Sequence, residues 1–489
     1  MFFLMIRKFQ DKIIFILSAI LFVAVCYKSA VTSFTHDESI TYLHYVKMDY
    51  ASIVAYNEPY TNNHILNTIL MKIAATLFGA QEWALRIPNL IALLVYLFFA
   101  YKLVKKIIPT FYLPGFILLL ANPYLIDFFG LARGYGLSIS CMIMCIYYFL
   151  CAIESSKWQD ILLFNLAAML AIYSNFALID FYVAVLVIYN VFLLNSYISS
   201  GKRFTVSVFF RKNAINISFA IATTLILWEP IRKISGPHML DFGGKSGLVA
   251  NTISSLITSA LYNISLPAIF VVCASWLLFT LIIITFLFWI VQYMKQGARM
   301  LIKYRYLISI NSILLIIFSE MEIQHIVLGT DFFIERFALF LFPLFIIQVL
   351  LLLQLLIASK INIVGSILQT VLVICLVVNT LFNMNLSYYR DWKYDIDTKK
   401  VMLIMKRHYL NHPHNAQVTL GVYWYFEPST NFYKDTWALS WLQPVERRDL
   451  TVKDNYYYSY RNELLNVDAP MSRTLYYSEQ TSAYLVYNQ

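Results

Sequence analysis

Two adjacent carboxylates, Asp37 and Glu38, follow directly after a long apolar stretch near the start of the chain. Ionised groups at a membrane boundary lose solvation, so two of them in one place need a chemical or structural reason. Neighbouring side chains on a helix point about 100° apart, so we expect one carboxylate to face a cavity and the other to have a structural partner. A carboxylate in a cavity can act as a general base. The competing interpretation is that both acids are solvated loop residues.

Two arginines lie at the ends of other apolar stretches. Arg133 occurs within Leu131-Ala-Arg-Gly-Tyr-Gly136, and Arg336 follows Glu335. The planar guanidinium group can bind a phosphate through two parallel hydrogen bonds. Each arginine could instead have a plainer role, because Arg133 could extend its charged head to the membrane surface and Arg336 could pair with Glu335. Together with the acidic pair, the two arginines favour an anionic lipid as substrate.

A polar cluster, Asn57-Glu-Pro-Tyr-Thr-Asn-Asn-His64, precedes an amphipathic segment. Asn63 can cap the helix that follows, and this structural role is sufficient to explain it. Alternatively, the amides and the imidazole could form the polar rim of a site for a sugar or another hydroxyl-rich ligand. The candidate substrate-binding residues are Tyr42, Asn62, Asn63, His64 and Tyr135.

The elements that must position these residues are membrane helices. The 489-residue chain is 60% hydrophobic and 13% charged, which excludes an ordinary water-soluble protein, and its 17% of aromatic residues excludes intrinsic disorder. A membrane-spanning helix needs about 20 apolar residues. The stretch from His64 to Phe78 is predicted to be an amphipathic helix in the membrane interface. Eleven segments are predicted to span the membrane, and they begin near Ile13, Trp83, Phe111, Tyr135, Ile161, Phe181, Ala214, Ile264, Leu307, Phe337 and Ile361.

The positions of the basic residues predict how the chain crosses the membrane. Lys and Arg gather in alternate short loops, for example at Lys105 and Lys106 and again at Arg211 and Lys212. By the positive-inside rule, this pattern predicts a cytoplasmic N-terminus and an outer C-terminus in a multi-pass protein of the bacterial inner membrane. The formal charge of +10 is therefore a topology signal, and no nucleic-acid partner is expected.

The predicted spans divide the chain into two domains. Residues 1–386 form an all-α transmembrane domain, whose first outer loop, residues 31–82, carries the acidic pair. Residues 387–489 form a small α/β soluble domain on the outer side. Within that domain, Val418–Phe426 mixes β-branched and aromatic residues and predicts strands.

Signals for a cofactor are weak. Gly243-Gly-Lys-Ser246 resembles the end of a phosphate-binding loop, but Met239 stands where the first glycine of that loop belongs. His408, His412 and His414 lack a cysteine or a carboxylate at the spacing of a metal site. We therefore expect no cofactor and no metal ion.

At these residues the sequence resembles the polyprenyl-phosphate-sugar-dependent membrane glycosyltransferases of the GT-C superfamily. The nearest branch includes protein O-mannosyltransferases and lipid A aminoarabinose transferases. The resemblance is strongest over roughly residues 10–180. The motifs that carry it are the acidic pair, the polar segment from Asn62 to His64, Trp83-Ala-Leu-Arg-Ile-Pro88 and Ala132-Arg-Gly-Tyr135.

The resemblance implies an activity and a set of roles. The activity is an inverting transfer of a sugar from a polyprenyl phosphate donor to an acceptor on the outer face of the membrane. Asp37 would be the general base, Glu38 would be a supporting acid, and Arg133 and Arg336 would bind the donor phosphate. The acceptor would be a glycan, a lipid or a protein, and the domain over residues 1–386 would be the catalytic one.

Two other classes of protein compete with this interpretation. A transporter or lipid flippase would place ionisable residues at mid-membrane and often contains helices broken by glycine or proline. Here the acids and arginines cluster at the ends of spans, and the chain has only 14 glycines. A non-catalytic scaffold would explain the tail but would leave the acidic loop unexplained. The sequence therefore favours a glycosyltransferase.

Overall fold

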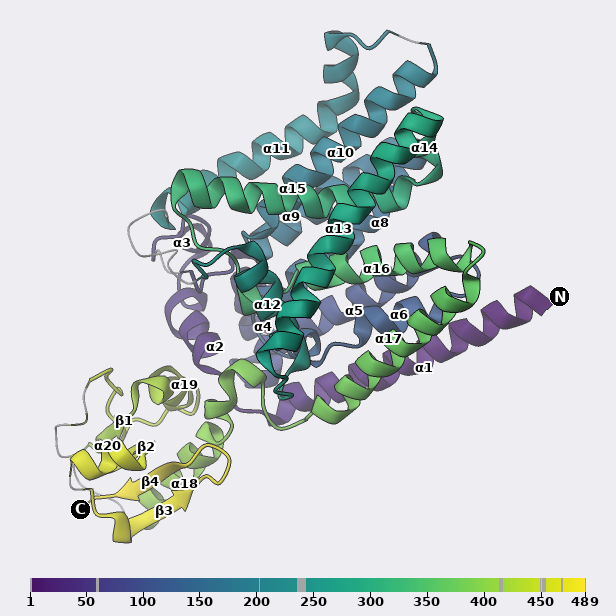
Figure 1. Cartoon of the computed structure of the whole chain (residues 1–489). Coiled ribbons are helices and arrows are strands. Elements are labelled where there is room, and N and C mark those ends of the chain that lie inside the picture. The colour runs from purple at the N-terminus through teal and green to yellow at the C-terminus, as the bar shows by residue number, and fades with distance from the viewer. Residues whose placement is uncertain are drawn as a thin grey trace.

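The computed structural model of the chain describes residues 2–58, 61–201, 203–234, 243–412, 417–448, 450, 454–467 and 469–488. These residues form a bundle of long helices with a small domain at one end that contains a four-stranded sheet (Figure 1). The predicted fold class, a helical membrane protein with a small C-terminal α/β domain, is confirmed.

Eight helices among the described residues are long and apolar enough to cross a membrane. Two shorter apolar helices, α9 (Trp158–Ser174) and α16 (Leu341–Ile357), pack against α8 and α15 respectively. This arrangement is that of an integral, multi-pass membrane protein. The eight long helices are α1 (Phe2–Val31), α5 (Glu82–Ile107), α8 (Gly134–Ser155), α10 (Leu178–Ser199), α11 (Val206–Ile234), α13 (Ala268–Gln296), α15 (Arg305–Leu328) and α17 (Asn362–Asn383).

One predicted span is not a continuous helix. The segment that begins near Phe111 divides into α6 (Leu113–Leu120) and α7 (Pro123–Asp127). Asn122 separates the two helices, because its side chain accepts hydrogen bonds from two backbone N–H groups in the first turn of α7, at 3.0 and 3.2 Å. This break and the short lengths of α9 and α16 explain why eleven spans are predicted but only eight long helices are found. The exact number of spans stays a prediction.

The loop between α1 and α5 contains the predicted interfacial helix. This helix, α4 (Ile65–Phe78), matches the predicted range to one residue. Gly79 follows it with a φ of +82°, a conformation that glycine adopts without strain. The shorter helical elements outside the C-terminal domain are α2 (His36–Ile40), η1 (Thr41–Val46), α3 (Tyr50–Val54), η2 (Leu248–Ile253), α12 (Ser254–Leu261), α14 (Arg299–Lys303) and η3 (Glu335–Phe337).

The C-terminal domain follows α17 and is built around a sheet with the strand order β1-β2-β4-β3. β1 pairs parallel to β2, whereas β4 pairs antiparallel to both β2 and β3. The predicted domain boundary after residue 386 stays a prediction. The elements of this domain are η4 (Arg390–Asp395), α18 (Thr398–Asn411), β1 (Leu420–Val422), η5 (Trp424–Phe426), α19 (Glu427–Thr436), β2 (Tyr456–Tyr460), α20 (Arg461–Asn466), η6 (Met471–Arg473), β3 (Thr474–Tyr477) and β4 (Ala483–Tyr487).

The strand prediction over Val418–Phe426 is right only for its middle. Leu420–Val422 forms β1, but Trp424–Phe426 forms a 3₁₀ turn. The turn leads directly into α19, where Pro428 occupies the first turn of the helix. Proline has a fixed φ that suits this position and cannot donate a hydrogen bond to a sheet, so the strand ends before it.

The loop after α1 and the C-terminal domain share one hydrophobic cluster. The ring of Phe34 stacks on Phe432 of α19 with 4.1 Å between the ring centroids. The backbone N–H of Phe34 donates to the hydroxyl of Tyr433 at 2.8 Å, and the hydroxyl of Ser33 donates to the carbonyl of Ile396 at 2.9 Å. The C-terminal domain therefore fixes the segment that leads into the acidic pair.

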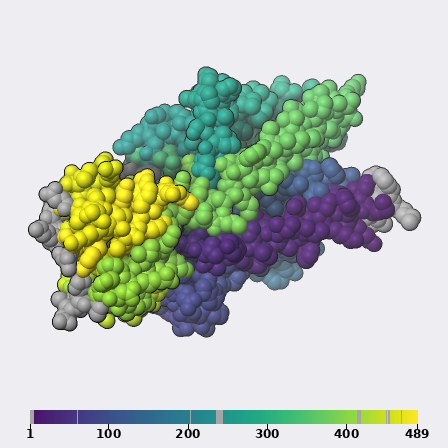
Figure 2. All heavy atoms as spheres, turned by 90° about the horizontal axis from the view of Figure 1, so that it is seen from below, coloured from purple at the N-terminus to yellow at the C-terminus, as the bar shows by residue number. Residues whose placement is uncertain are grey.

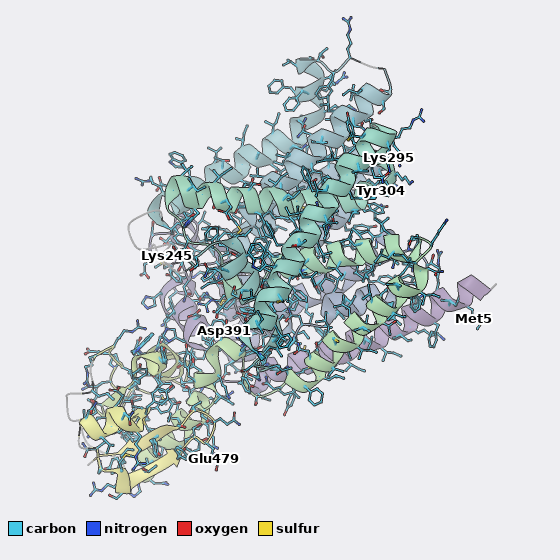
Figure 3. The ribbon with its side chains drawn as sticks, in the orientation of Figure 1. Met5, Lys245, Lys295, Tyr304, Asp391 and Glu479 are labelled. Carbon is cyan, nitrogen blue, oxygen red and sulfur yellow. The ribbon has the colours of Figure 1, made fainter. Side chains whose placement is uncertain are left out.

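The C-terminal domain lies at one end of the helical bundle, and the N-terminus lies toward the other. Figure 2 shows the C-terminal domain packed at one end, with the N-terminal helix α1 running along the bundle away from it. In Figure 3, Asp391 lies at the junction between the helical bundle and the C-terminal domain. Met5, Lys295 and Tyr304 lie toward the other end of the bundle. The acidic pair lies at the junction end, because α2 packs against α19.

Candidate active site

Asp37 lies in the first turn of α2, where one of its carboxylate oxygens faces two arginines from distant parts of the chain. Its Oδ2 atom is 3.5 Å from Nη2 of Arg133 and 3.8 Å from Nη2 of Arg336. The side chain is 13% exposed, and Oδ2 makes no hydrogen bond. Burial raises the pKa of Asp37, but the two guanidinium groups outweigh burial and hold this pKa below its ordinary value. Asp37 is therefore ionised at neutral pH.

Glu38 belongs to a separate, closed network. Its two oxygens accept hydrogen bonds from Nε and Nη2 of Arg86 at 2.8 and 2.7 Å, and both side chains are fully buried. The backbone N–H groups of Thr35 and Ala132 donate to the same carboxylate at 2.9 and 2.6 Å. With both oxygens occupied, Glu38 has no atom free for a substrate. Glu38 therefore fixes α2 against α5, and its predicted place in the catalytic set, as a supporting acid, stays a prediction.

Arg133 directly precedes α8, and its guanidinium group lies against the polar loop. Nη2 donates to the side-chain oxygen of Asn62 at 2.9 Å, and Nη1 donates to the backbone carbonyl of Asn62 and to the hydroxyl of Thr41, both at 3.2 Å. The side chain of Arg133 is only 2% exposed, and its Nε atom has no hydrogen-bond partner. Asn62 therefore orients Arg133, and a direct contact of Asn62 with substrate stays a prediction.

Arg336 reaches Asp37 from η3. Its Nη1 atom is 3.7 Å from Oδ2 of Asp391, and its guanidinium group lies over the ring of Trp392 at 5.4 Å. Within the described residues it pairs with these two aspartates rather than with Glu335, its neighbour in sequence. Glu335 has a φ of +48°, an unfavourable conformation for a residue with a side chain, and such backbone strain clusters at functional sites.

His64 and Tyr135 pack together beside Arg133. Their rings meet edge to face with 5.0 Å between centroids. Gly134 permits this approach, because a Cβ atom there would lie 1.9 Å from the carbonyl oxygen of Ser174 and 2.7 Å from the ring of His64. Burial lowers the pKa of His64 well below its ordinary value and Arg133 lowers it further, so the imidazole is neutral. Its Nε2 atom is buried without a hydrogen bond.

Asn63 has a structural role, but it is not the predicted role of helix N-cap. His64, not Asn63, is the N-cap residue of α4. The side chain of Asn63 donates to the carbonyl of Ile53 at 3.1 Å and accepts a hydrogen bond from the hydroxyl of Thr68 at 3.0 Å. It therefore joins α3 to α4, and a contact with substrate stays a prediction.

Tyr42 faces the C-terminal domain. Its ring packs edge to face on Phe432 with 5.3 Å between centroids. Burial raises the pKa of Tyr42 to about 12, with a further contribution from the carboxylate of Asp435, which hydrogen-bonds the phenol. Tyr42 therefore contributes to the interface between the loop and the C-terminal domain, and its predicted contact with substrate stays a prediction.

Two pockets lie between the helices, and one of them is lined in part by residues of this cluster. One, of about 340 Å³, lies between the start of α4, the α9–α10 turn, the ends of α11 and α15, and the segment around η3, and it is lined in part by His64 and Phe337. The ring of Tyr135 packs with both of these rings, at 5.0 and 6.3 Å. The other pocket, of about 300 Å³, lies between α4, α5 and α8 and is lined almost wholly by apolar side chains, including Leu70, Ile73, Leu77, Ile87, Ile91 and Val95.

Four buried polar atoms around Asp37 have no hydrogen-bond partner among the residues that the structure describes. Buried polar groups in proteins are nearly always paired, so unpaired ones indicate a place that a polar ligand completes. The guanidinium groups can hold a phosphate, and the ionised carboxylate can accept a proton. Among the described residues, no group of three His, Cys, Asp or Glu side chains is placed to hold a metal ion. The four atoms are Oδ2 of Asp37, Nε of Arg133, Nε of Arg336 and Nε2 of His64.

Sequence reasoning missed three contributors to this site. Arg86 stands within an apolar span, and a charge in that position needs a partner, which is a signal that could have identified its pair with Glu38. Asp391 and Trp392 follow the last span, and the indole of Trp392 hydrogen-bonds Asp37. Nothing in sequence separates these two residues from the rest of the polar tail, because their role depends on how the C-terminal domain docks.

The chain is similar to several known proteins. Residues 64–228 match the family model described as dolichyl-phosphate-mannose-protein mannosyltransferase. No curated protein matches the sequence. Similar solved structures include ArnT from Cupriavidus metallidurans bound to undecaprenyl phosphate, with 10% identity, 96% of each chain covered and a TM-score of 0.47. They also include the oligosaccharyltransferase AglB from Archaeoglobus fulgidus in complex with an inhibitory peptide and a dolichol-phosphate, with 11% identity, 99% of this chain and 75% of that chain covered, and a TM-score of 0.44.

The structural similarities are too low to carry site residues from one protein to another. The family match is independent of them and extends from the start of α4 into α11. It includes the Arg86 motif and the segment with Arg133 and Tyr135. It supports the resemblance to the GT-C membrane glycosyltransferases that the sequence motifs indicate.

Proposed function

We propose that the chain transfers a sugar, with inversion, from a polyprenyl-phosphate donor to a hydroxyl group of a glycan, lipid or protein acceptor. The observation that carries this proposal is the meeting of an ionised carboxylate and two arginines, each with an unpaired polar atom, at the edge of a pocket. The carboxylate is that of Asp37, and the arginines are Arg133 and Arg336. The family match supports the class of reaction.

The two arginines bind the phosphate of the donor. A phosphate accepts charge-assisted hydrogen bonds from guanidinium groups, and in a partly buried site these bonds also stabilise the charge of the departing phosphate. The apolar pocket between α4, α5 and α8 offers the isoprenoid chain an apolar surface. No nucleotide is needed, because the sugar is already activated by its phosphate.

Asp37 accepts the proton of the acceptor hydroxyl. As that oxygen attacks the anomeric carbon, the bond from this carbon to the phosphate oxygen breaks, and the polyprenyl phosphate leaves with the electron pair. The arginines that lower the pKa of Asp37 are the same groups that bind the phosphate. A bound phosphate neutralises part of their charge, so it raises the pKa of Asp37 and makes it a stronger base once the donor is in place.

The proposed reaction takes place on the outer face of a bacterial inner membrane, with the N-terminus in the cytoplasm. The site lies at the end of the bundle that carries the C-terminal domain, as Asp391 in Figure 3 indicates. Met5 and Lys295 lie toward the opposite end, where predicted inner loops contain many of the basic residues. Labelling of single cysteines from either side of intact cells would test this orientation.

The direct test of the mechanism is Asp37→Asn. This change keeps the size of the side chain but removes the base, so we expect a loss of transfer of about 10²–10⁴-fold. Mass spectrometry of lipid-linked sugars and envelope glycans, in cells with the native or the variant chain, would show donor accumulating and product disappearing. Thermal melting of the purified protein in detergent should change little.

The matched control is Asp49→Asn. Asp49 lies in the same loop, is the N-cap of α3, and accepts a hydrogen bond from the backbone N–H of Ser52 at 2.9 Å, a function that asparagine also performs. It should leave transfer unchanged. Near-normal transfer by Asp37→Asn would contradict the proposed role of Asp37.

A further inference from the structure

The pocket next to the arginines contains an acid that the reaction as proposed does not use. Asp180 lies in the first turn of α10, is 6% exposed, and lines the pocket. Its Oδ1 atom accepts a hydrogen bond from Nε2 of Gln324 on α15 at 2.8 Å. Its Oδ2 atom is buried and has no hydrogen-bond partner. A buried carboxylate oxygen without a partner is costly, so it indicates a ligand that donates a hydrogen bond there.

A second acid is close in sequence to this pocket but does not line it. Glu320 lies one helical turn before Gln324 on α15, and its Oε2 atom is also buried without a partner. Within the described part of the chain, neither Asp180 nor Glu320 forms an ion pair with a lysine, arginine or histidine. Asp180 is therefore the acid that this pocket presents to a ligand.

The remaining walls suit a ligand with many hydroxyl groups. Thr61, Ser174 and Asn175 supply neutral polar groups, and Phe176 and Phe337 supply aromatic faces. A mostly apolar pocket with a few convergent polar groups is typical of a small-molecule site, and about 340 Å³ falls within the usual range of such pockets.

The position of the pocket relates it to the donor. The anomeric carbon of the donor is bonded to its phosphate, so the sugar must lie directly beside the groups that bind the phosphate. The pocket shares His64 and Phe337 with the cluster around Arg133 and Arg336: the guanidinium group of Arg336 lies 5.3 Å from the ring of Phe337, and Tyr135 contacts both aromatic residues.

We infer that this pocket is the subsite for the sugar of the donor, and that Asp180 selects sugars that present hydrogen-bond donors and carry no negative charge. This inference rests on the proposed function. Hydroxyl groups of the sugar donate to Oδ2 of Asp180, whose geometry Gln324 fixes. A sugar acid is disfavoured, because its carboxylate would lie against the carboxylate of Asp180, and like charges repel strongly in a partly desolvated site.

Binding of free sugars to the full-length chain in detergent tests the subsite without requiring transfer. Glucose and glucuronate are suitable probes, with their dissociation constants measured by saturation-transfer NMR at neutral pH. For the native chain we expect glucose to bind at least about tenfold more tightly than glucuronate. Asp180→Asn should weaken glucose binding and bring the two dissociation constants within about twofold of each other.

Two further variants keep the test decisive. Gln324→Glu adds a negative charge beside Asp180, so it should increase the preference for glucose over glucuronate even if Asp180→Asn fails to fold. Glu229→Gln is the matched control, because Glu229 near the end of α11 is exposed and pairs with Arg232, so the ratio should not change. Equal binding of the two sugars by the native chain, or an unchanged ratio in both Asp180→Asn and Gln324→Glu, would overturn the inference.

The outcome is separable from that of the proposed reaction. Asp37→Asn should abolish transfer and leave the sugar preference intact, because Asp37 does not line this pocket. If Asp37→Asn retained transfer, the assignment of the base would fail while the sugar ratios still reported on the subsite. Asp37→Asn could abolish transfer while Asp180→Asn and Gln324→Glu leave the ratio of the two sugar dissociation constants unchanged. That result would support Asp37 as the base and contradict the sugar subsite.

Discussion

Asp37 and Glu38 are neighbours in sequence, yet their surroundings are opposite. Glu38 is fully buried and saturated by Arg86 and two backbone N–H groups at 2.6–2.9 Å. Asp37 is 13% exposed, and its arginines stay 3.5 and 3.8 Å away. Glu38 with Arg86 is a closed pair: it stabilises the fold but has no atom free to bind a substrate. Asp37 with Arg133 and Arg336 is an open pair: the carboxylate and the guanidinium groups keep their charges and their unpaired atoms available for a ligand.

The closed pair makes the open one possible. Glu38 accepts the backbone N–H of Thr35, which starts α2, and Arg86 also donates to the carbonyl of Ser29 near the end of α1 at 2.8 Å. The position of α2 is thereby fixed relative to both α1 and α5. Because its helix is fixed, Asp37 stays 3.5 and 3.8 Å from the two arginines, whereas a mobile carboxylate would move closer and form direct hydrogen bonds.

The largest effect that separates the two acids is expected from Glu38→Gln. This change leaves the guanidinium group of Arg86 buried without a counter-charge, and breaking such a pair costs about 3–5 kcal/mol of unfolding free energy. The measurement is thermal melting and monodisperse yield in detergent, compared with Asp37→Asn. We expect Glu38→Gln to lose most of the folded protein and Asp37→Asn to keep it. Equal stability of the two variants would remove the distinction between a closed and an open pair.

A second large effect is expected at Gly134. A Cβ atom there would overlap the carbonyl oxygen of Ser174 and the ring of His64, so Gly134→Ala must displace the backbone next to Arg133. Overpacking of this kind costs about 1–3 kcal/mol and should also lower transfer, because Arg133 moves relative to Asp37. Gly201→Ala is a useful comparison, because a Cβ atom there meets no neighbour, although its φ of +66° brings a cost of its own. Full transfer by Gly134→Ala would show that the position of Arg133 is not critical.

The sequence predicted the parts of this site that depend on local pattern. The range of α4, the division of labour between two adjacent acids, and the candidacy of Arg133 and Arg336 follow from periodicity, from helix geometry and from the cost of charge near a membrane. The break at Asn122-Pro123 was missed, although asparagine followed by proline is a signal for a helix start.

Other features could not be predicted, because they depend on contacts between distant segments. Asn62 has the side chain of a sugar-binding residue, but its oxygen accepts a hydrogen bond from Arg133, seventy-one positions away. Trp392 of the C-terminal domain reaches Asp37 in the first loop, whereas Tyr42 of that loop reaches Phe432 in the C-terminal domain. No local pattern distinguishes these outcomes.

Arg336→Ala sharpens the comparison by opening the pair around Asp37 further. Removal of one cation should raise the pKa of Asp37, because an opposite charge at this distance favours the ionised form. The acid limb of the kcat/KM profile, which reports the free enzyme, should therefore move to higher pH. The KM for the lipid donor should rise more than the KM for the acceptor. An unchanged acid limb with equal changes in both KM values would assign Arg336 a structural role.

The smallest effect is expected from Tyr42→Phe, which tests where the site ends. The hydroxyl of Tyr42 hydrogen-bonds Asp435, so its loss should cost about 0.5–1.5 kcal/mol of unfolding free energy, measured by thermal melting. Transfer should stay within about twofold of the native rate, because the open pair around Asp37 has no contact with this hydroxyl. A change in the KM for either substrate, with stability unchanged, would instead return Tyr42 to the substrate-binding set. The site would then extend from Asp37 to Tyr42, and the open pair around Asp37 would no longer mark its boundary.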